Sequence, residues 1–186
     1  YSEDAGEGLQ LRCLDRDFFS DAIACSLKCQ TSGCGIMENN VFDGISRACE
    51  RLSIAYAVYL DTQRYGEFAA LFGDEGVLKV SGRVEGQTAI ARAMANRPAT
   101  LRSRHVLTNI LIEPVDQEHA TGTTYLSLYR HIGEASLEDR PIEPFAPAAV
   151  GHYSDQFKLT NQGWRFAYRE LHLAFRNPEY FDPFGG

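Results

Sequence analysis

The stretch LRSRHVLTNILIEPV, residues 101–115, is the most strand-like segment of the chain. Apolar and β-branched residues dominate it from Val106 onward, and Pro114 closes it. Alternate side chains of a strand point to opposite faces of a sheet. One face is therefore predicted to hold His105, Leu107, Asn109 and Leu111. The other is predicted to be an ordinary packing face of Val106, Thr108, Ile110 and Ile112.

The first of these faces admits two interpretations. An imidazole and an amide placed between leucines are typical of the wall of a mostly apolar ligand pocket. Alternatively, His105 is a hydrogen-bonded histidine in the core or at its rim. The strand by itself leaves both open.

The composition indicates a globular domain with a substantial core. Of the 186 residues, 44% are hydrophobic and 23% are charged. The 18 basic and 25 acidic residues give a formal charge of −7, and no stripe of Lys or Arg is present, so we expect no nucleic-acid partner. No apolar run approaches the roughly 20 residues of a membrane-spanning helix. The acidic start YSEDAGEGLQ lacks the features of a signal peptide, so a cytoplasmic location is expected.

Cysteine and histidine spacing predicts no metal site. The cysteines are Cys13, Cys25, Cys29, Cys34 and Cys49, and their spacing matches neither paired CxxC nor a Cys/His finger, so free thiols are expected. The five histidines show no metal-ligand spacing either. We predict no metal and no cofactor.

Residues 1–36 differ from the rest and are predicted to be an extension outside the core. Met37 resembles a natural start position, and a far more regular sequence follows it. Asp15 or Asp17 could cap a short helix over residues 18–30, with Gly33 and Gly35 ending it.

The remaining pattern predicts three helices and then a long antiparallel meander. Apolar residues at three- and four-residue steps predict helix from Val41, with a break or cap at Asp61 and a second short helix over residues 65–72. Residues 73–76 are predicted to be a turn. Beyond it we expect a strand at 77–80, a helix at 87–96, and strands at 104–115, 120–131, 150–159 and 164–175, with a long loop at 132–149. Such an α+β chain forms a cone in which the helices line one face of a curved antiparallel sheet and enclose a pocket.

Four motifs resemble the SnoaL-like branch of the NTF2-like superfamily, which includes scytalone dehydratase. They are AYAVYLDTQRYGEFAALFGDEG at 55–76, the pair Gly86 and Ile90, RSRHVLTNI at 102–110, and GHYSDQFKLTNQGWRFAYRE at 151–170. The resemblance covers residues of about 41–176. It implies an NTF2-like domain at 37–176, followed by a Pro/aromatic tail at 177–186.

The resemblance also implies an Asp/His dyad. Asp61 and His105 match the pair that scytalone dehydratase-like members use, in which the imidazole is a general base or acid. A neighbouring carboxylate fixes the tautomer of a histidine and favours its protonation. From the residues alone, Asp61 could instead be a helix cap.

The chain departs from scytalone dehydratase at several positions. Leu60 replaces a tyrosine, Gly151-x-Tyr153 replaces a Ser-x-Asn pair, and the second catalytic histidine falls near Arg130. His131 is the next residue, and alternation lets only one of the two reach a cavity. A different substrate is therefore expected.

The expected activity is that of a cofactor-independent lyase or isomerase, of the dehydratase or cyclase type, acting on a hydrophobic oxygenated small molecule. The predicted substrate-binding residues are Asn109, Tyr153, Arg130 and Tyr56. Tyr153 could equally be a core aromatic with its hydroxyl at the rim. A structural ion pair is expected between Asp155 and Arg169. His152 and His172 are expected on the outer face of the sheet, which commonly makes the contacts between subunits in this superfamily. We therefore expect a homo-oligomer, either a dimer or a trimer.

Three alternatives stay open at this point. A non-catalytic subunit, such as the β subunit of a ring-hydroxylating dioxygenase, predicts a filled cone and a stable complex with an iron-containing chain. A small-molecule-binding protein predicts binding without product. An epoxide hydrolase would need an Asp/Arg/Asp arrangement that the strands do not clearly supply.

Overall fold

A computed structural model describes residues 34–143 and 145–180. The chain divides into two compact units, Tyr1–Asn40 and Val41–Gly186, and the sheet lies in the second. The predicted helix over residues 18–30 and three of the cysteines, Cys13, Cys25 and Cys29, fall outside the described residues. The predicted division at residue 36 stays a prediction.

The helices lie close to their predicted positions. They are α2 (Cys34–Asp61), α3 (Tyr65–Ala69) and α4 (Gln87–Ala95). Gly35 was expected to end a helix, but it lies inside α2. The predicted apolar stripe of α2 is buried at Ile45, Cys49, Tyr56 and Leu60. Because Asp61 is the last residue of α2, the stripe leads directly to it.

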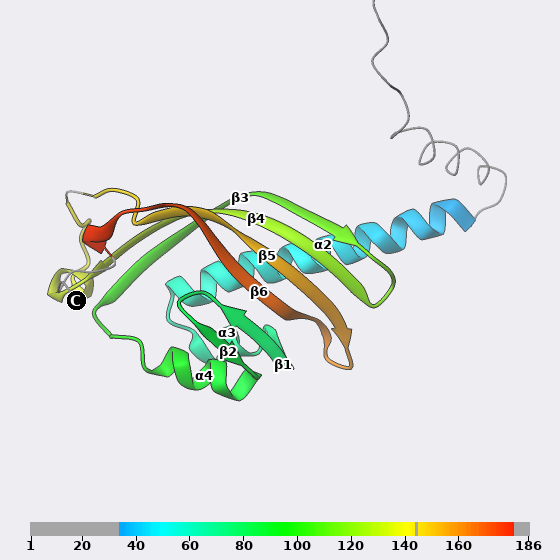
Figure 1. Cartoon of the computed structure of the whole chain (residues 1–186), viewed down its shortest axis with the longest axis horizontal. Helices are drawn as coiled ribbons and strands as arrows, with labels where there is room; N and C mark the ends of the chain where they lie inside the picture. The colour runs from blue at the N-terminus through cyan, green and yellow to red at the C-terminus, as the bar shows by residue number, and fades with distance from the viewer. Residues whose placement is uncertain (1–33, 144, 181–186) are drawn as a thin grey trace, which may run out of the picture. The chain divides into compact units, whose positions relative to one another are not determined.

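Six strands form a single curved sheet beneath which these helices lie (Figure 1). The strands are β1 (Phe72–Lys79), β2 (Arg83–Glu85), β3 (Leu101–Pro114), β4 (His119–Ile132), β5 (Ala149–Thr160) and β6 (Gly163–Arg176), in the order β2-β1-β6-β5-β4-β3. Short 3-10 helices occupy Glu134–Leu137 (η1) and Pro178–Tyr180 (η2). The pairing of β1 with β6 is parallel, so the sheet is mixed rather than antiparallel as expected.

The predicted turn at residues 73–76 is wrong, because these residues lie inside β1. The pairing of β1 with β6 is irregular between Phe72 and Val77, which accommodates the two glycines in the strand. A Cβ atom on Gly76 would lie 2.9 Å from the carbonyl oxygen of Phe166. Glycine is therefore needed here for close approach of the two backbones, not for a reversal of the chain.

A bulge in β3 overturns the predicted faces of that strand. The register with β4 shifts between Thr108 and Leu111, and Asn109 adopts a left-handed φ of 48°. Before the bulge, the inward residues include Ser103 and His105, and Val106 is exposed rather than packed as expected. After it, Leu111 is exposed and Ile112 packs against the core. The alternation therefore reverses along the strand.

The core between α2 and the concave face of the sheet is rich in aromatic rings. The Tyr56 ring lies with its centroid 4.7 Å from that of Phe68 and 5.4 Å from that of Tyr153, and Phe72 and Phe166 complete the cluster. All five side chains are at most 2% exposed. Burying an apolar side chain of this size contributes roughly 1.5–3 kcal/mol. This cluster fixes the end of α2 against the middle of the sheet.

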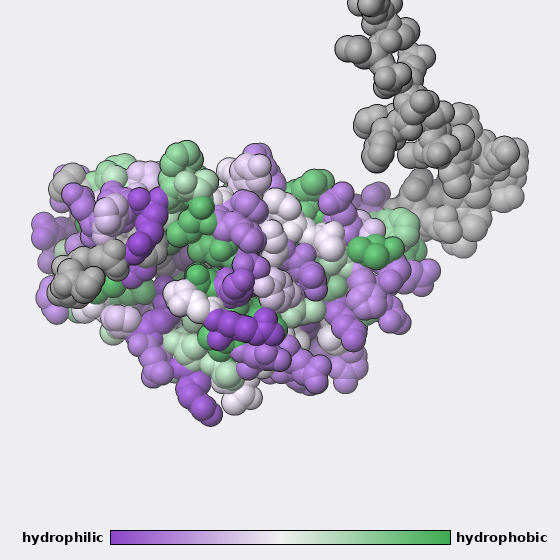
Figure 2. Space-filling model, in the orientation of Figure 1, coloured by the Kyte–Doolittle hydropathy of each residue, from purple (hydrophilic) through white to green (hydrophobic). Residues whose placement is uncertain are grey.

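The opposite face of the sheet carries a row of rings across three strands. His152 stacks on His172 with centroids 5.0 Å apart, and Tyr125 lies 6.1 Å from His152. The face drawn in Figure 2 intersperses hydrophobic residues with hydrophilic ones. Within the described part of the chain, no helix has the length and apolar character needed to cross a membrane.

Candidate active site

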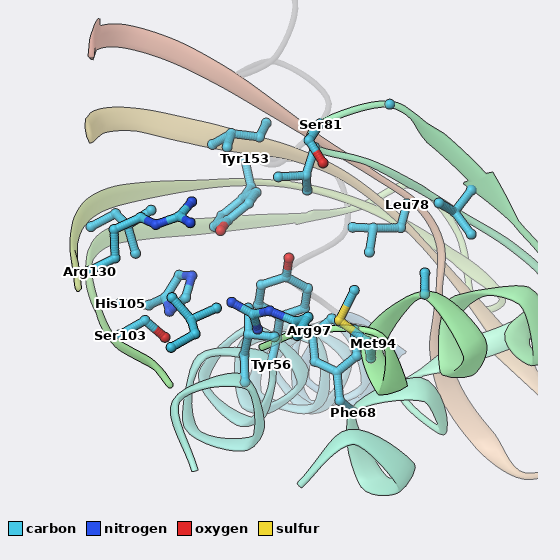
Figure 3. A pocket seen from close by; sticks show the side chains of 18 of the residues that line it. Tyr56, Phe68, Leu78, Ser81, Met94, Arg97, Ser103, His105, Arg130 and Tyr153 are labelled. Carbon is cyan, nitrogen blue, oxygen red and sulfur yellow. The ribbon is translucent and has the colours of Figure 1, made fainter. Parts of the chain in front are cut away.

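A cavity of about 700 Å³ lies between the sheet and the helices of the second unit (Figure 3). Apolar side chains make most of its wall, among them Leu60, Phe68, Leu78, Leu128 and Leu171. Polar groups interrupt this wall at several points, namely Tyr56, Ser81, Asn96, Arg97, Ser103, His105, Arg130, Tyr153 and Arg176. This mixture is typical of a site for a small organic molecule.

Asp61 and His105 form a hydrogen-bonded pair at the cavity. The His105 Nδ1 lies 2.6 Å from Asp61 Oδ1, and the backbone N–H of His105 donates to Asp61 Oδ2 at 2.7 Å. The side chain of His105 is 6% exposed and that of Asp61 is 10% exposed. Since His105 also lines the cavity, one ring nitrogen faces Asp61 and the other is available to the cavity.

Ser103 completes this arrangement and was missed by the sequence reasoning. Its hydroxyl donates to Asp61 Oδ1 at 2.8 Å, and its side chain is buried beside His105. Burial alone would raise the pKa of the Asp61 carboxyl, but the hydrogen bonds and charge of His105, together with the Ser103 hydroxyl, hold that pKa below its ordinary value. Asp61 is thus a carboxylate bound to β3 rather than a helix cap. The signal for Ser103 was available, because it precedes His105 by two residues on the same strand face.

Two tyrosine hydroxyls belong to the same cavity. Tyr56 is 2% exposed and Tyr153 is 1% exposed, and the two phenol groups are hydrogen-bonded to each other. Burial raises the pKa of Tyr56, although the charge of Arg169 opposes this. Burial and the neighbouring Tyr56 raise the pKa of Tyr153 well above its usual range. Both hydroxyls are therefore protonated at neutral pH, and since one of them donates to the other, one O–H is left to donate to a ligand.

The Arg169 guanidinium packs against the rings of these two tyrosines. Its Nε and Nη2 donate to the two carboxylate oxygens of Asp155, each at 2.7 Å, which is the ion pair predicted from the sequence. Its guanidinium carbon lies 4.2 Å from the ring centroid of Tyr56 and 4.3 Å from that of Tyr153. The pair is fully buried and absent from the cavity wall.

Of the adjacent residues Arg130 and His131, Arg130 is the one that lines the cavity. Arg130 lies on β4 opposite Ser103. His131 lines a second cavity of about 520 Å³, to which Arg130 and Ser103 also contribute.

Asn109 does not lie in the cavity, which corrects the prediction that it shares a face with His105. It is exposed at the β3 bulge and is absent from the cavity wall. Strand alternation predicted that Asn109 points inward, because the two-residue period of a strand does not reveal a one-residue bulge.

Cys49 is a free, buried thiol, as expected for this cysteine. Burial, and then the charge of Asp155, raise its pKa to about 12, so it is no nucleophile at neutral pH. No group of three His, Cys, Asp or Glu side chains in the described residues is placed to hold a metal ion.

The chain matches the family model of the SnoaL-like domain over residues 46–170. A search of curated proteins finds no match. Among solved structures, a candidate scytalone dehydratase from Novosphingobium aromaticivorans is 23% identical, with a TM-score of 0.59 over 70% of this chain and 85% of the other. An NTF2-like protein with a cystatin-like fold from the same organism is 17% identical, with a TM-score of 0.59 over 90% of this chain and 99% of the other.

A third structure, a candidate aromatic ring hydroxylase from the same organism, is 19% identical, with a TM-score of 0.59 over 70% of this chain and 89% of the other. At these identities the likeness establishes the fold alone. That fold is NTF2-like, as the sequence motifs predicted.

Proposed function

This chain belongs to the SnoaL-like domain family, and from that membership we propose that it is a cofactor-independent lyase or isomerase of the dehydratase or cyclase type. It would act on a hydrophobic, oxygenated small molecule bound in the 700 Å³ cavity. A cytoplasmic location and a homo-oligomer, dimer or trimer, accompany this proposal as predictions.

One observation carries the proposal, namely the pairing of His105 Nδ1 with Asp61 Oδ1 at 2.6 Å. A neutral imidazole that donates its Nδ1–H to a carboxylate keeps Nε2 as a proton acceptor. The carboxylate then stabilises the imidazolium that forms when Nε2 takes a proton. A buried pair of this kind at the wall of an apolar cavity favours general acid-base chemistry.

In the proposed step, His105 Nε2 removes a proton from a carbon next to the carbonyl of the substrate. The electron pair of the broken C–H bond moves to the carbonyl oxygen and gives an enolate. The imidazolium returns the proton to a leaving hydroxyl, which departs as water, or to another carbon, which completes an isomerisation. Asp61 orients the imidazole throughout, and Ser103 holds Asp61.

The enolate oxygen requires hydrogen-bond donors that are already in place. The hydroxyl of Tyr56 or Tyr153 is suited to this, because burial keeps both protonated and only one of them is used as donor in the bond between the two. Arg130 supplies a positive charge at the same cavity. Donors fixed in a site of low dielectric constant need no reorganisation as charge develops.

The cavity also bears on the alternatives. A non-catalytic subunit was expected to have a filled cone, whereas about 700 Å³ is open here. A protein that only binds its ligand would have no need of an oriented imidazole, and the experiment below distinguishes the two.

Hydrogen–deuterium exchange tests the proton abstraction without knowledge of the natural substrate. 2-Tetralone, an apolar bicyclic ketone, would be incubated with the full chain in D₂O, and deuterium uptake next to its carbonyl would be followed by NMR. We expect exchange above the buffer rate, and a decrease of about 10²- to 10⁴-fold in the enzymatic part for His105→Ala.

His119→Ala is the matched control. His119 also pairs with an aspartate, with Nδ1 3.0 Å from Asp116 Oδ1, but this pair is exposed on the hairpin between β3 and β4 and lies outside the cavity. Its exchange rate should equal that of the unsubstituted chain. Full exchange by a folded His105→Ala variant, or no exchange by the unsubstituted chain, would refute the proposal.

A further inference from the structure

The side chains that line the cavity differ in charge from the chain as a whole. The whole chain carries a formal charge of −7, yet three arginines line the cavity: Arg97, Arg130 and Arg176. Among the described residues of the wall there is no Asp or Glu. Asp61 lies behind His105 and is already bound to it and to Ser103. The wall itself therefore contributes arginine side chains and no carboxylate.

Arg97 has an unfilled hydrogen-bonding group. It follows the end of α4, its guanidinium carbon lies 5.7 Å from the ring centroid of Tyr65, and its Nη1 is buried without a hydrogen-bond partner among the described residues. A buried charged donor without an acceptor is costly, so such a group requires a partner, and a bound ligand can supply one. Figure 3 shows Arg97 reaching into the same space as His105 and Tyr56.

Arg130 brings a second positive charge to this space. Its pKa is lowered by burial and, after that, by the charge of Arg97, because two cations in one cavity repel each other. An anion held between them would relieve this repulsion. Guanidinium groups bind carboxylates through paired N–H donors, which gives both affinity and orientation.

We propose that the substrate is an apolar carboxylic acid whose carboxylate is bound by Arg97 and Arg130, with its hydrocarbon body against Leu78, Leu128 and Leu171. This inference extends the proposed function, because the bound acid is a substrate only if the proposed chemistry takes place. The carboxylate is the anchor and remains unchanged, while the carbonyl next to the abstracted proton is a separate group of the molecule.

Two naphthalene derivatives of nearly equal shape test the anchor by binding alone. 2-Naphthoate carries the carboxylate and 2-naphthamide is uncharged, and each would be titrated into the full chain by isothermal titration calorimetry. We expect 2-naphthoate to bind at least about tenfold more tightly. Arg97→Gln should remove this preference with little change in the binding of 2-naphthamide, and Arg97→Lys should retain part of it.

Arg92→Gln is the matched control. Arg92 is exposed on α4, five positions before Arg97, and is absent from the cavity wall, so the same loss of charge there should leave both affinities unchanged. Circular dichroism would verify that each variant is folded. Equal binding of the two probes, binding of neither, or an equal effect of Arg92→Gln and Arg97→Gln would overturn the inference.

The two proposals can fail separately. Arg97-dependent binding of 2-naphthoate together with 2-tetralone exchange that ignores His105 would retain the acid-binding cavity and remove the proposed chemistry. His105-dependent exchange with no preference for 2-naphthoate would do the reverse.

Discussion

Two buried aspartates pair with a basic side chain in this fold, and the two pairs differ in what surrounds them. Asp155 and Arg169 are both 0% exposed and are enclosed by aromatic rings, away from the cavity wall. Asp61 and His105 are 10% and 6% exposed, and His105 borders the cavity. The first pair is sealed in the core, and the second opens on one side.

The base in each pair matches its surroundings. An arginine stays protonated at any ordinary pH, so the Asp155–Arg169 pair can fix the strands and position Tyr56 and Tyr153 but cannot move a proton. An imidazole can take up and release a proton, and His105 borders the cavity in which the proposed substrate would lie. The difference indicates that burial of an ion pair alone does not identify an active site. The proposed active site rests instead on a titratable base with access to a cavity.

Breaking the sealed pair should have the largest effect on stability. Arg169→Met leaves Asp155 buried without its partner, and we expect the free energy of unfolding to fall by about 3–5 kcal/mol in urea denaturation. His105→Gln should cost much less, because Asp61 keeps the donors of Ser103 and of the His105 backbone. A greater loss for His105→Gln than for Arg169→Met would break the comparison.

Two serines offer a sharper version of the same comparison. Ser103 donates to Asp61 at the cavity, and Ser53 accepts from Arg169 Nη2 at 3.0 Å in the core. Ser103→Ala should lower the exchange rate of 2-tetralone about tenfold, which corresponds to about 1.4 kcal/mol. Ser53→Ala should lower the free energy of unfolding by about 1 kcal/mol and leave the rate near that of the unsubstituted chain. Both quantities would be measured for both variants, and identical profiles would contradict the assignment of separate roles.

The smallest expected effect is the pH dependence of the Asp61 contribution to stability. The pKa of Asp61 in the folded chain lies below its ordinary value of 3.8, so its carboxylate form stabilises the fold above that pH. This contribution is lost as the pH falls through the lower folded-state pKa, where both states are protonated. The difference in unfolding free energy between the unsubstituted chain and Asp61→Asn should therefore shrink from pH 5 toward pH 3, to about zero at the lowest pH. A difference that does not vary with pH would exclude the proposed role of the carboxylate charge.

The periodic parts of this fold could be predicted from the sequence. The apolar stripe of α2 depends on regular spacing and is confirmed. Of the predicted inward face of β3, only His105 and Leu107, which precede the bulge, lie inward. The dyad partners came from the family motifs, which predicted Asp61 beside His105 across 44 positions of sequence. Regular spacing and the family motifs together therefore predicted the Asp61–His105 pair.

The irregular parts could not be predicted in the same way. The bulge at Asn109 and the glycines inside β1 depend on how two strands meet, which no single strand encodes. Arg97 lies in the connection after α4 and gave no periodic signal, so its place at the cavity came from the structure alone. The parallel pairing of β1 with β6 likewise joins segments far apart in the sequence.

The bulge at Asn109 divides β3 into two parts that pair with β4 in different registers. His105 and Ser103 precede it, and the strand tip at Leu111 and Ile112 follows it, so the register of the tip is set separately from that of the dyad. Deletion of Asn109 would leave Ile110 alone opposite Thr124, so Leu111 and Ile112 would keep their partners Thr123 and Gly122 and their present faces. The bulge can thus gain or lose one residue without moving either the tip or the pairing of His105 with Asp61, which makes it a position where a change in strand length is absorbed locally.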